Sequence, residues 1–93
     1  MLDEDGYPTD ECLEKIKHWP AQDGIGLLNF IKEIWWHPEY IIFNDDHTVS
    51  VSTVGFSGNE DIIEAMMANR VWWSSYWHST SRGGHYIFDL FDF

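Results

Sequence analysis

The spacing of apolar residues, which changes from helical to strand-like along the chain, is the feature that most constrains its fold. Apolar side chains recur every three or four positions between Thr9 and Pro20, and again between Asp23 and Pro38. This spacing places them on one face of a helix. Thr9 and Asp23 are of the residue types that cap helix starts, and a proline ends each segment. The first third of the chain therefore predicts two amphipathic helices.

The middle of the chain predicts a hairpin followed by a helix. Residues 39–43 are aromatic and β-branched, residues 44–47 have turn chemistry, and residues 48–54 alternate between two faces, one of them polar. Ser57 and Glu60 then form an S-x-x-E pattern, which is typical of a capping box at a helix start. A helix from about residue 58 to residue 69 is expected to follow.

The last quarter predicts a second hairpin. Residues 71–78 alternate as in a strand, the glycines in the loop 80–84 permit a tight return, and residues 85–91 supply the final strand. The prediction is an α+β fold in the order ααββαββ, in which a four-stranded, mainly antiparallel sheet packs against the helices. Residues 1–93 are expected to form one compact domain with a mobile acidic N-terminus over about residues 1–8.

Charge limits the class of partner. Sixteen Asp and Glu against five Lys and Arg give a formal charge of −11, while six Trp, six Phe and four Tyr supply the apolar surface that a disordered acidic tail lacks. Such a charge disfavours nucleic acid and membranes and favours basic protein surfaces. The chain has no apolar run near the roughly 20 residues that cross a bilayer, so a soluble cytosolic protein is expected. The single cysteine, Cys12, excludes an internal disulfide and is expected to be buried.

Two motifs carry a resemblance to a known family. Residues 54–60 (VGFSGNE) and 81–88 (SRGGHYIF) are similar to segments of a family of small, uncharacterised acidic proteins from phage and prophage genomes, and the likeness covers most of the chain after Thr9. The resemblance implies a phage protein acting in the cytosol of a host cell. Small acidic phage proteins are often inhibitors of host defence, such as anti-CRISPR or anti-restriction proteins, and some imitate DNA.

The first hypothesis is therefore a non-enzymatic inhibitor that binds a basic host protein or a nucleic-acid-binding complex. Carboxylates concentrate in the first third of the chain, where they either decorate an ordinary solvated helix surface or compete with phosphates for an Arg- and Lys-lined groove. The aromatic excess predicts a partly exposed patch that anchors a partner or a second copy in a homodimer. The predicted partner-binding residues are Asp3, Glu4, Asp5, Asp10, Glu11, Glu14, Asp23, Glu33, Glu39, Trp36, Tyr40, Trp72 and Trp77.

Two alternatives come from different classes. One is a small enzyme or anion-binding domain at a helix N-terminus, with Ser57, Gly58, Asn59, His78, Arg82 and His85 as its residues. A capping role for Ser57 and a turn role for the glycines oppose it. The other alternative is a structural phage component that self-associates through exposed aromatics. No metal site, cofactor or catalytic residue is predicted, because the five histidines lack metal-binding spacings on a helix and no nucleophile motif is present.

Overall fold

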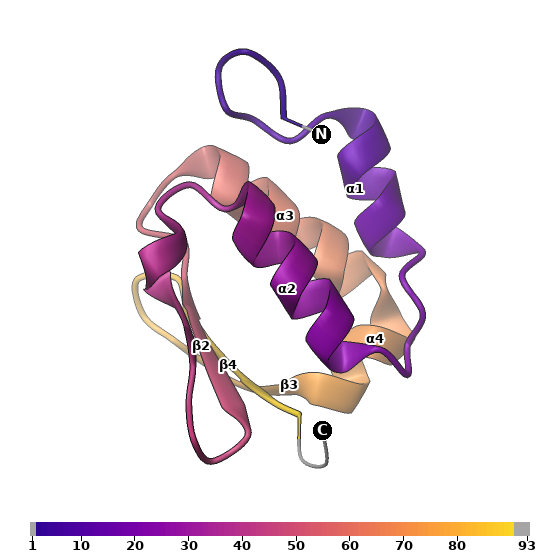
Figure 1. The fold of residues 1–93 in the computed structure, drawn as a ribbon, viewed down its shortest axis with the longest axis vertical. Coiled ribbons are helices and arrows are strands. Elements are labelled where there is room, and N and C mark those ends of the chain that lie inside the picture. The colour runs from indigo at the N-terminus through magenta and orange to yellow at the C-terminus, as the bar shows by residue number, and fades with distance from the viewer. Residues whose placement is uncertain (1, 91–93) are drawn as a thin grey trace.

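The computed structural model describes residues 2–90 and places four helices against an antiparallel sheet (Figure 1). The elements are α1 (Asp10–Lys17), α2 (Gly24–Ile34), the short 3-10 helix η1 (Pro38–Tyr40), β1 (Ile41–Phe43), β2 (Thr48–Ser52), α3 (Ser57–Ala68), α4 (Arg70–Tyr76), β3 (Trp77–Ser81) and β4 (His85–Asp89). The predicted α+β class and the order ααββαββ are confirmed, with α4 as an additional helix before the second hairpin.

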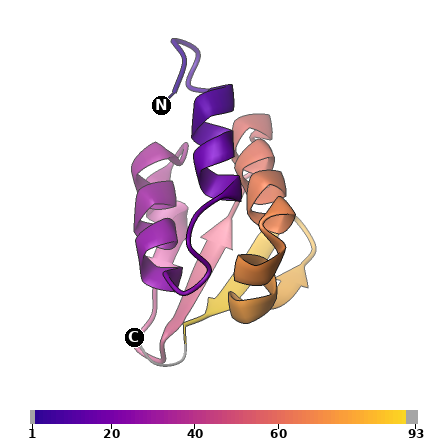
Figure 2. The ribbon, with the colours of Figure 1, turned by 90° about the vertical axis from the view of Figure 1, so that its right-hand side faces the viewer.

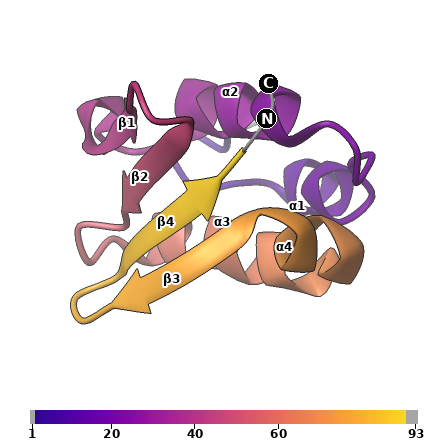
Figure 3. The same ribbon diagram turned by 90° about the horizontal axis from the view of Figure 1, so that it is seen from below.

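The sheet has the strand order β1-β2-β4-β3, so its two hairpins meet through β2 and β4. In this central pairing Val49 lies opposite Phe88 and Val51 lies opposite Tyr86. Because side chains alternate between the faces of a sheet, these residues share one face. The helices gather against that face, as Figure 3 shows from below, and they leave the other face uncovered within residues 2–90.

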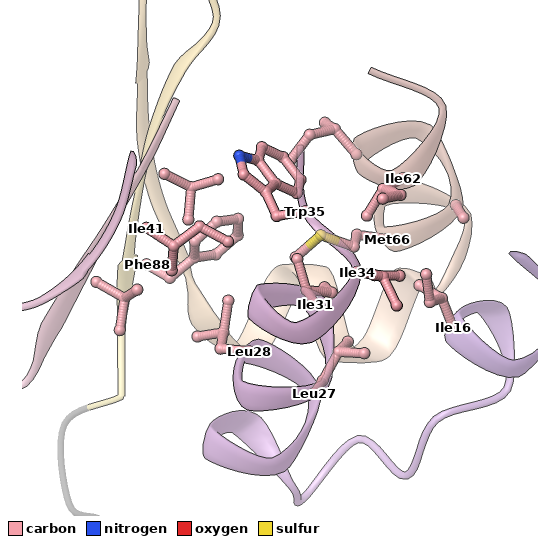
Figure 4. Close-up of a cluster of buried hydrophobic side chains, with 14 of the residues drawn as sticks. Ile16, Leu27, Leu28, Ile31, Ile34, Trp35, Ile41, Ile62, Met66 and Phe88 are labelled. Atoms are coloured by element: carbon pink, nitrogen blue, oxygen red, sulfur yellow. The ribbon is translucent and has the colours of Figure 1, made fainter. Parts of the chain in front are cut away.

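The core lies between the sheet and the helices (Figure 4). The four α-helices and the central strands contribute fully buried side chains to it, among them Ile16, Leu27, Leu28, Ile31, Met66, Trp72 and Phe88. Cys12 is also fully buried, as predicted, and burial raises the pKa of its thiol.

The prediction of a strand over residues 71–78 is wrong, because residues 70–76 form α4 and β3 begins at Trp77. Alternating Trp and Ser residues suit a strand, but the same segment also fits a helical spacing. Trp72 and Tyr76 are one helical turn apart, with ring centroids 4.9 Å from each other, and Trp72 lies 5.7 Å from Phe88 across the core. Burial of the large Trp72 side chain therefore outweighs the local preference for a strand.

Two of the three predicted helix caps are present. The Thr9 hydroxyl accepts a hydrogen bond from the Cys12 amide, and the Asp23 carboxylate accepts one from the Gly26 amide. The capping box at Ser57 is wrong, since α3 starts after Phe56 with no side-chain cap. The Ser57 hydroxyl instead lies 2.9 Å from the hydroxyl of Tyr7.

Residues 2–8 form a turn that contacts the start of α3. Asp3 accepts hydrogen bonds from the amides of Asp5 and Tyr7, and the Tyr7 ring lies 4.9 Å from that of Phe56. The mobility of this segment stays a prediction. Within residues 2–90, no helix combines the length and the apolar character needed to span a membrane.

Candidate interaction surface

An acidic surface spans two neighbouring helices. Figure 2 shows α1 and α3 side by side below the N-terminal turn. Residues three or four apart share one side of a helix, so each helix presents its outward carboxylates as a stripe. We call the two stripes the acidic helix face, which consists of Asp10 and Glu14 of α1 and of Glu60, Asp61 and Glu64 of α3. Four of these residues are exposed and Asp61 is half-buried.

Two cations lie near the acidic helix face without forming ion pairs with its α3 carboxylates: Lys17 borders a hollow with Asp61 and Glu64, and Arg70 borders another with Glu64. Glu14 lies 3.6 Å from the Lys17 ammonium and 3.2 Å from the His18 ring. The other four carboxylates make no ion pair within residues 2–90. Two further lysines are turned toward aromatic rings instead, Lys15 over Phe30 at 4.9 Å and Lys32 over Phe43 at 5.6 Å. Side chains of the fold therefore offset the negative charge of this surface only in part, and solvent ions or a partner compensate the rest.

Three members of the acidic helix face were not among the predicted partner-binding residues. The sequence pattern assigns Glu60 to the capping box and gives Asp61 and Glu64 no role. The spacing of 60, 61 and 64 was the available signal, because it sets three carboxylates on one side of α3. What the sequence did not supply was the packing of α3 beside α1.

A row of aromatic rings runs from the N-terminal turn past the start of α3 to η1. The successive ring centroids are separated by 4.9 Å from Tyr7 to Phe56, 4.6 Å from Phe56 to Trp36, 4.1 Å from Trp36 to His37 and 6.3 Å from His37 to Tyr40. We call these five residues the aromatic ridge. Trp36 is 46% exposed and Tyr40 is 47% exposed. Half-exposed Trp and Tyr side chains are typical anchors of protein interfaces.

Carboxylates border the aromatic ridge. Glu39 lies between His37 and Tyr40 in the chain and is 3.1 Å from the His37 ring. Its own backbone amide, and after it the His37 ring, lowers the pKa of Glu39. Asp3, Glu4 and Asp5 are exposed in the same turn as Tyr7. The structure thus brings the predicted residues Trp36, Glu39 and Tyr40 together, next to the acidic N-terminal turn.

The remaining predicted partner-binding residues lie elsewhere. Trp72 is fully buried, so its assignment to an exposed patch is wrong. Trp77 is 42% exposed, but it stacks on Trp73 where α4 meets β3. The Asp23 carboxylate is occupied as the cap of α2 and as the acceptor for the Trp19 indole. Glu11 and Glu33 are exposed on α1 and α2.

The start of α3 is built as structure and not as an anion site. Asn59 is 1% exposed, and its amide nitrogen donates to the Trp36 and Thr53 carbonyls while its oxygen accepts from the Trp36 amide. The Phe56 ring covers Gly58 so closely that a Cβ there would lie 2.5 Å from it. With the Ser57 hydroxyl on Tyr7, the side chains of this helix start are engaged by the protein itself.

The other residues of the alternative site do not join this helix start. His78, Arg82 and His85 are exposed on the β3–β4 hairpin, and within residues 2–90 no hydrogen bond or ion pair links them to one another or to Ser57. A hollow of about 290 Å³ on the uncovered sheet face includes His85 beside Tyr40 and Ile42, but neither His78 nor Arg82. Residues 2–90 contain no group of three or more His, Cys, Asp or Glu side chains that could hold a metal ion.

Comparison with known proteins adds no assignment, since no family model, curated protein or solved structure matches this chain. The likeness to phage proteins stays a prediction from two motifs. The structure does bring these motifs together, because the Thr53 amide, just before the first, donates to the Gly84 carbonyl in the second at 3.0 Å. Gly84 has a φ of +76°, and a Cβ there would lie 2.2 Å from the Thr53 hydroxyl. Glycine at this position is thus required by the turn itself.

Proposed function

We propose that this protein is a non-enzymatic binding protein whose acidic surface engages a basic partner protein. The observation that supports this most strongly is the acidic helix face, in which four of five carboxylates on adjacent helices have no ion-pair partner within residues 2–90. Like charges gathered on one surface repel one another, and a basic partner relieves that repulsion while the field speeds its encounter.

The resemblance to phage proteins suggests the setting of this activity. In the proposed role, the protein acts in the cytosol of an infected host and inhibits a defence complex that binds nucleic acid, such as a CRISPR or restriction complex. Carboxylates along α1 and α3 take the place of phosphates in a groove lined by Arg and Lys, since both groups accept charge-assisted hydrogen bonds from these side chains. Direct binding of nucleic acid is not part of the proposal, because phosphates would be repelled by a chain of charge −11.

A matched pair of charge variants tests the proposal. Asp61→Asn with Glu64→Gln removes two charges from the acidic helix face, and Glu33→Gln with Asp45→Asn removes two charges elsewhere. None of these four carboxylates makes a hydrogen bond or ion pair within residues 2–90, so both variants are expected to fold normally. Each is expressed in bacteria that carry a CRISPR or restriction system, and the plating efficiency of a phage sensitive to that system is measured.

The wild-type protein is expected to raise plating efficiency in cells with the inhibited system. The Asp61/Glu64 variant is expected to lose most of this effect, and the Glu33/Asp45 variant to keep it. A pull-down from host lysate should give the partner at about 50 mM salt and lose it at about 500 mM, where the Debye length is only a few Å. Equal activity of the two variants, or capture that does not depend on salt, would contradict an electrostatic mode of binding.

A further inference from the structure

The aromatic ridge contains an indole that the protein leaves unused. Four of the six Trp side chains donate their indole N–H to an acceptor within the fold, namely Trp19 to Asp23, Trp35 to Ser52, Trp72 to Asp23 and Trp77 to Thr80. Trp36 and the half-buried Trp73 have no such acceptor among residues 2–90, and Trp36 is the exposed one of the two, at 46%, at the centre of the ridge. Nearly half of the Trp36 side chain is therefore open to a partner, and its indole N–H has no acceptor within residues 2–90.

The rest of the fold indicates which chemistry fits an exposed ring here. Two of the five Lys and Arg residues lie over aromatic rings, Lys15 over Trp19 and Phe30 and Lys32 over Phe43. No described cation lies over Trp36 or Tyr40 in this way. The electron-rich faces of these two rings attract a cation, and Glu39 beside them adds a full negative charge.

Building on the proposed function, we propose that the aromatic ridge binds arginine side chains of the basic partner. A guanidinium is planar, so it can stack on the Trp36 or Tyr40 ring while its N–H groups donate to the Glu39 carboxylate. An ammonium is a compact and strongly hydrated point charge with no planar face to stack on a ring, so it gains less from this combination. The acidic helix face attracts any basic surface, and the ridge selects arginine over lysine.

A second copy of this chain suits the ridge less well than a basic partner does. Each copy carries a charge of −11, and the carboxylates that border the ridge would face one another across such an interface. Charge complementarity therefore favours a cationic occupant.

The test compares two synthetic peptides of equal length and charge, octa-arginine and octa-lysine. Their dissociation constants are measured by isothermal titration calorimetry for the wild type, for Trp36→Leu and for the control Trp77→Leu, which removes another exposed indole away from the ridge. Wild type is expected to prefer octa-arginine. Trp36→Leu is expected to reduce the preference by about two- to fivefold, the size of an exposed cation–π contact, and Trp77→Leu to leave it unchanged.

The outcomes separate this inference from the proposed function. If the Asp61/Glu64 variant weakens both peptides but Trp36→Leu leaves the arginine preference intact, the ridge does not read arginine and the acidic surface still binds. If neither peptide binds the wild type, both proposals fail. Sedimentation that shows a dimer broken by Trp36→Leu would assign the ridge to a second copy. Thermal melts check that each variant is folded, and Tyr40→Leu repeats the test if Trp36→Leu unfolds.

Discussion

The starts of α2 and α3 are built in different ways. At α2 a single polar side chain caps the helix: the Asp23 carboxylate accepts a hydrogen bond from the Gly26 amide at 2.9 Å and another from the Trp19 indole at 3.0 Å. At α3 no side chain caps the helix, and the entry is held by the Tyr7 and Trp36 rings around Phe56. The first start is specified by neighbours in sequence, whereas the second needs residues from three distant segments.

At the start of α2 the stabilising groups are not available to a partner. At the start of α3 the same residues stabilise the fold and form the proposed binding surface. The Asp23 carboxylate that caps α2 already accepts hydrogen bonds from the Gly26 amide and the Trp19 indole. The rings that order the start of α3 are partly exposed, and they form the surface that we assign to a partner. Substitutions in the two places should therefore have different consequences, and the following predictions test that expectation.

The largest effect is expected at Asn59, which holds the segment before η1 against the start of α3. Asn59→Ala removes three hydrogen bonds and leaves the main-chain groups of Trp36 and the Thr53 carbonyl without their partner. The free energy of unfolding should fall by about 2–4 kcal/mol in urea denaturation, because stranded polar groups are costly. Asn29→Ala on the exposed side of α2 is the control, with an expected change near zero. Similar losses for both would show that the start of α3 does not depend on this amide.

The caps themselves give the sharpest contrast. Asp23→Ala should lower the free energy of unfolding by about 1–2.5 kcal/mol, because the cap and the acceptor for the Trp19 indole are lost together. Ser57→Ala should cost less than about 0.5 kcal/mol, since its exposed hydroxyl caps no amide. Thermal melts of the two variants at the same pH measure both. A loss at Ser57 as large as that at Asp23 would restore the capping box that the sequence predicts.

The turn that leads into α3 carries strain that the entry to α2 lacks. The Phe56 amide donates to the Thr53 carbonyl across this turn, and Val54 within it has a φ of +48°. A β-branched residue is strained in this left-handed region, which Asn tolerates. Val54→Asn should therefore raise the free energy of unfolding by about 1 kcal/mol. Val54→Thr keeps the β-branch and should give no gain, so a gain from both would attribute the effect to something other than strain.

The smallest expected effect is the loss of folding stability at low pH. The Thr48 hydroxyl and amide lower the pKa of Asp46. The pKa of Glu39 is lowered by the backbone amide of Glu39 itself. A carboxyl whose pKa is lower in the folded state stabilises the fold fully above its unfolded pKa and loses that contribution as pH falls through its folded pKa. Both groups are fully exposed, so only a shallow acid decline in stability is expected. NMR titration should place both midpoints below ordinary values, and Thr48→Val should return that of Asp46 alone toward normal.

Local patterns predicted those parts of the fold that local interactions decide. Neighbours within a few residues decide the caps at Thr9 and Asp23, the two amphipathic helices α1 and α2, and the β1–β2 hairpin. The α4 segment could not be assigned in this way, because the spacing of Trp72 and Tyr76 fits both a strand and a helix. Burial of Trp72 against Phe88 decides in favour of the helix.

The candidate surface was predicted in part for the same reason. Trp36, Glu39 and Tyr40 are close in sequence, so their proximity follows from the chain itself. The contribution of Asp61 and Glu64 depends on α3 lying beside α1, and Tyr7 joins the aromatic ridge through a contact with Phe56 that is 49 positions away in sequence. No pattern in a single sequence specifies such contacts.

Because Cys12 is buried, the reactivity of its thiol reports how often α1 opens. A thiol with no exposed surface and a raised pKa reacts with an alkylating reagent only after the helix around it opens. The alkylation rate of the native protein therefore reports how often α1 detaches from α3, a local opening that equilibrium unfolding does not resolve. Because Asp10 and Glu14 lie on this helix, a bound partner should slow the reaction, and the native Cys12 reports engagement without any engineered probe.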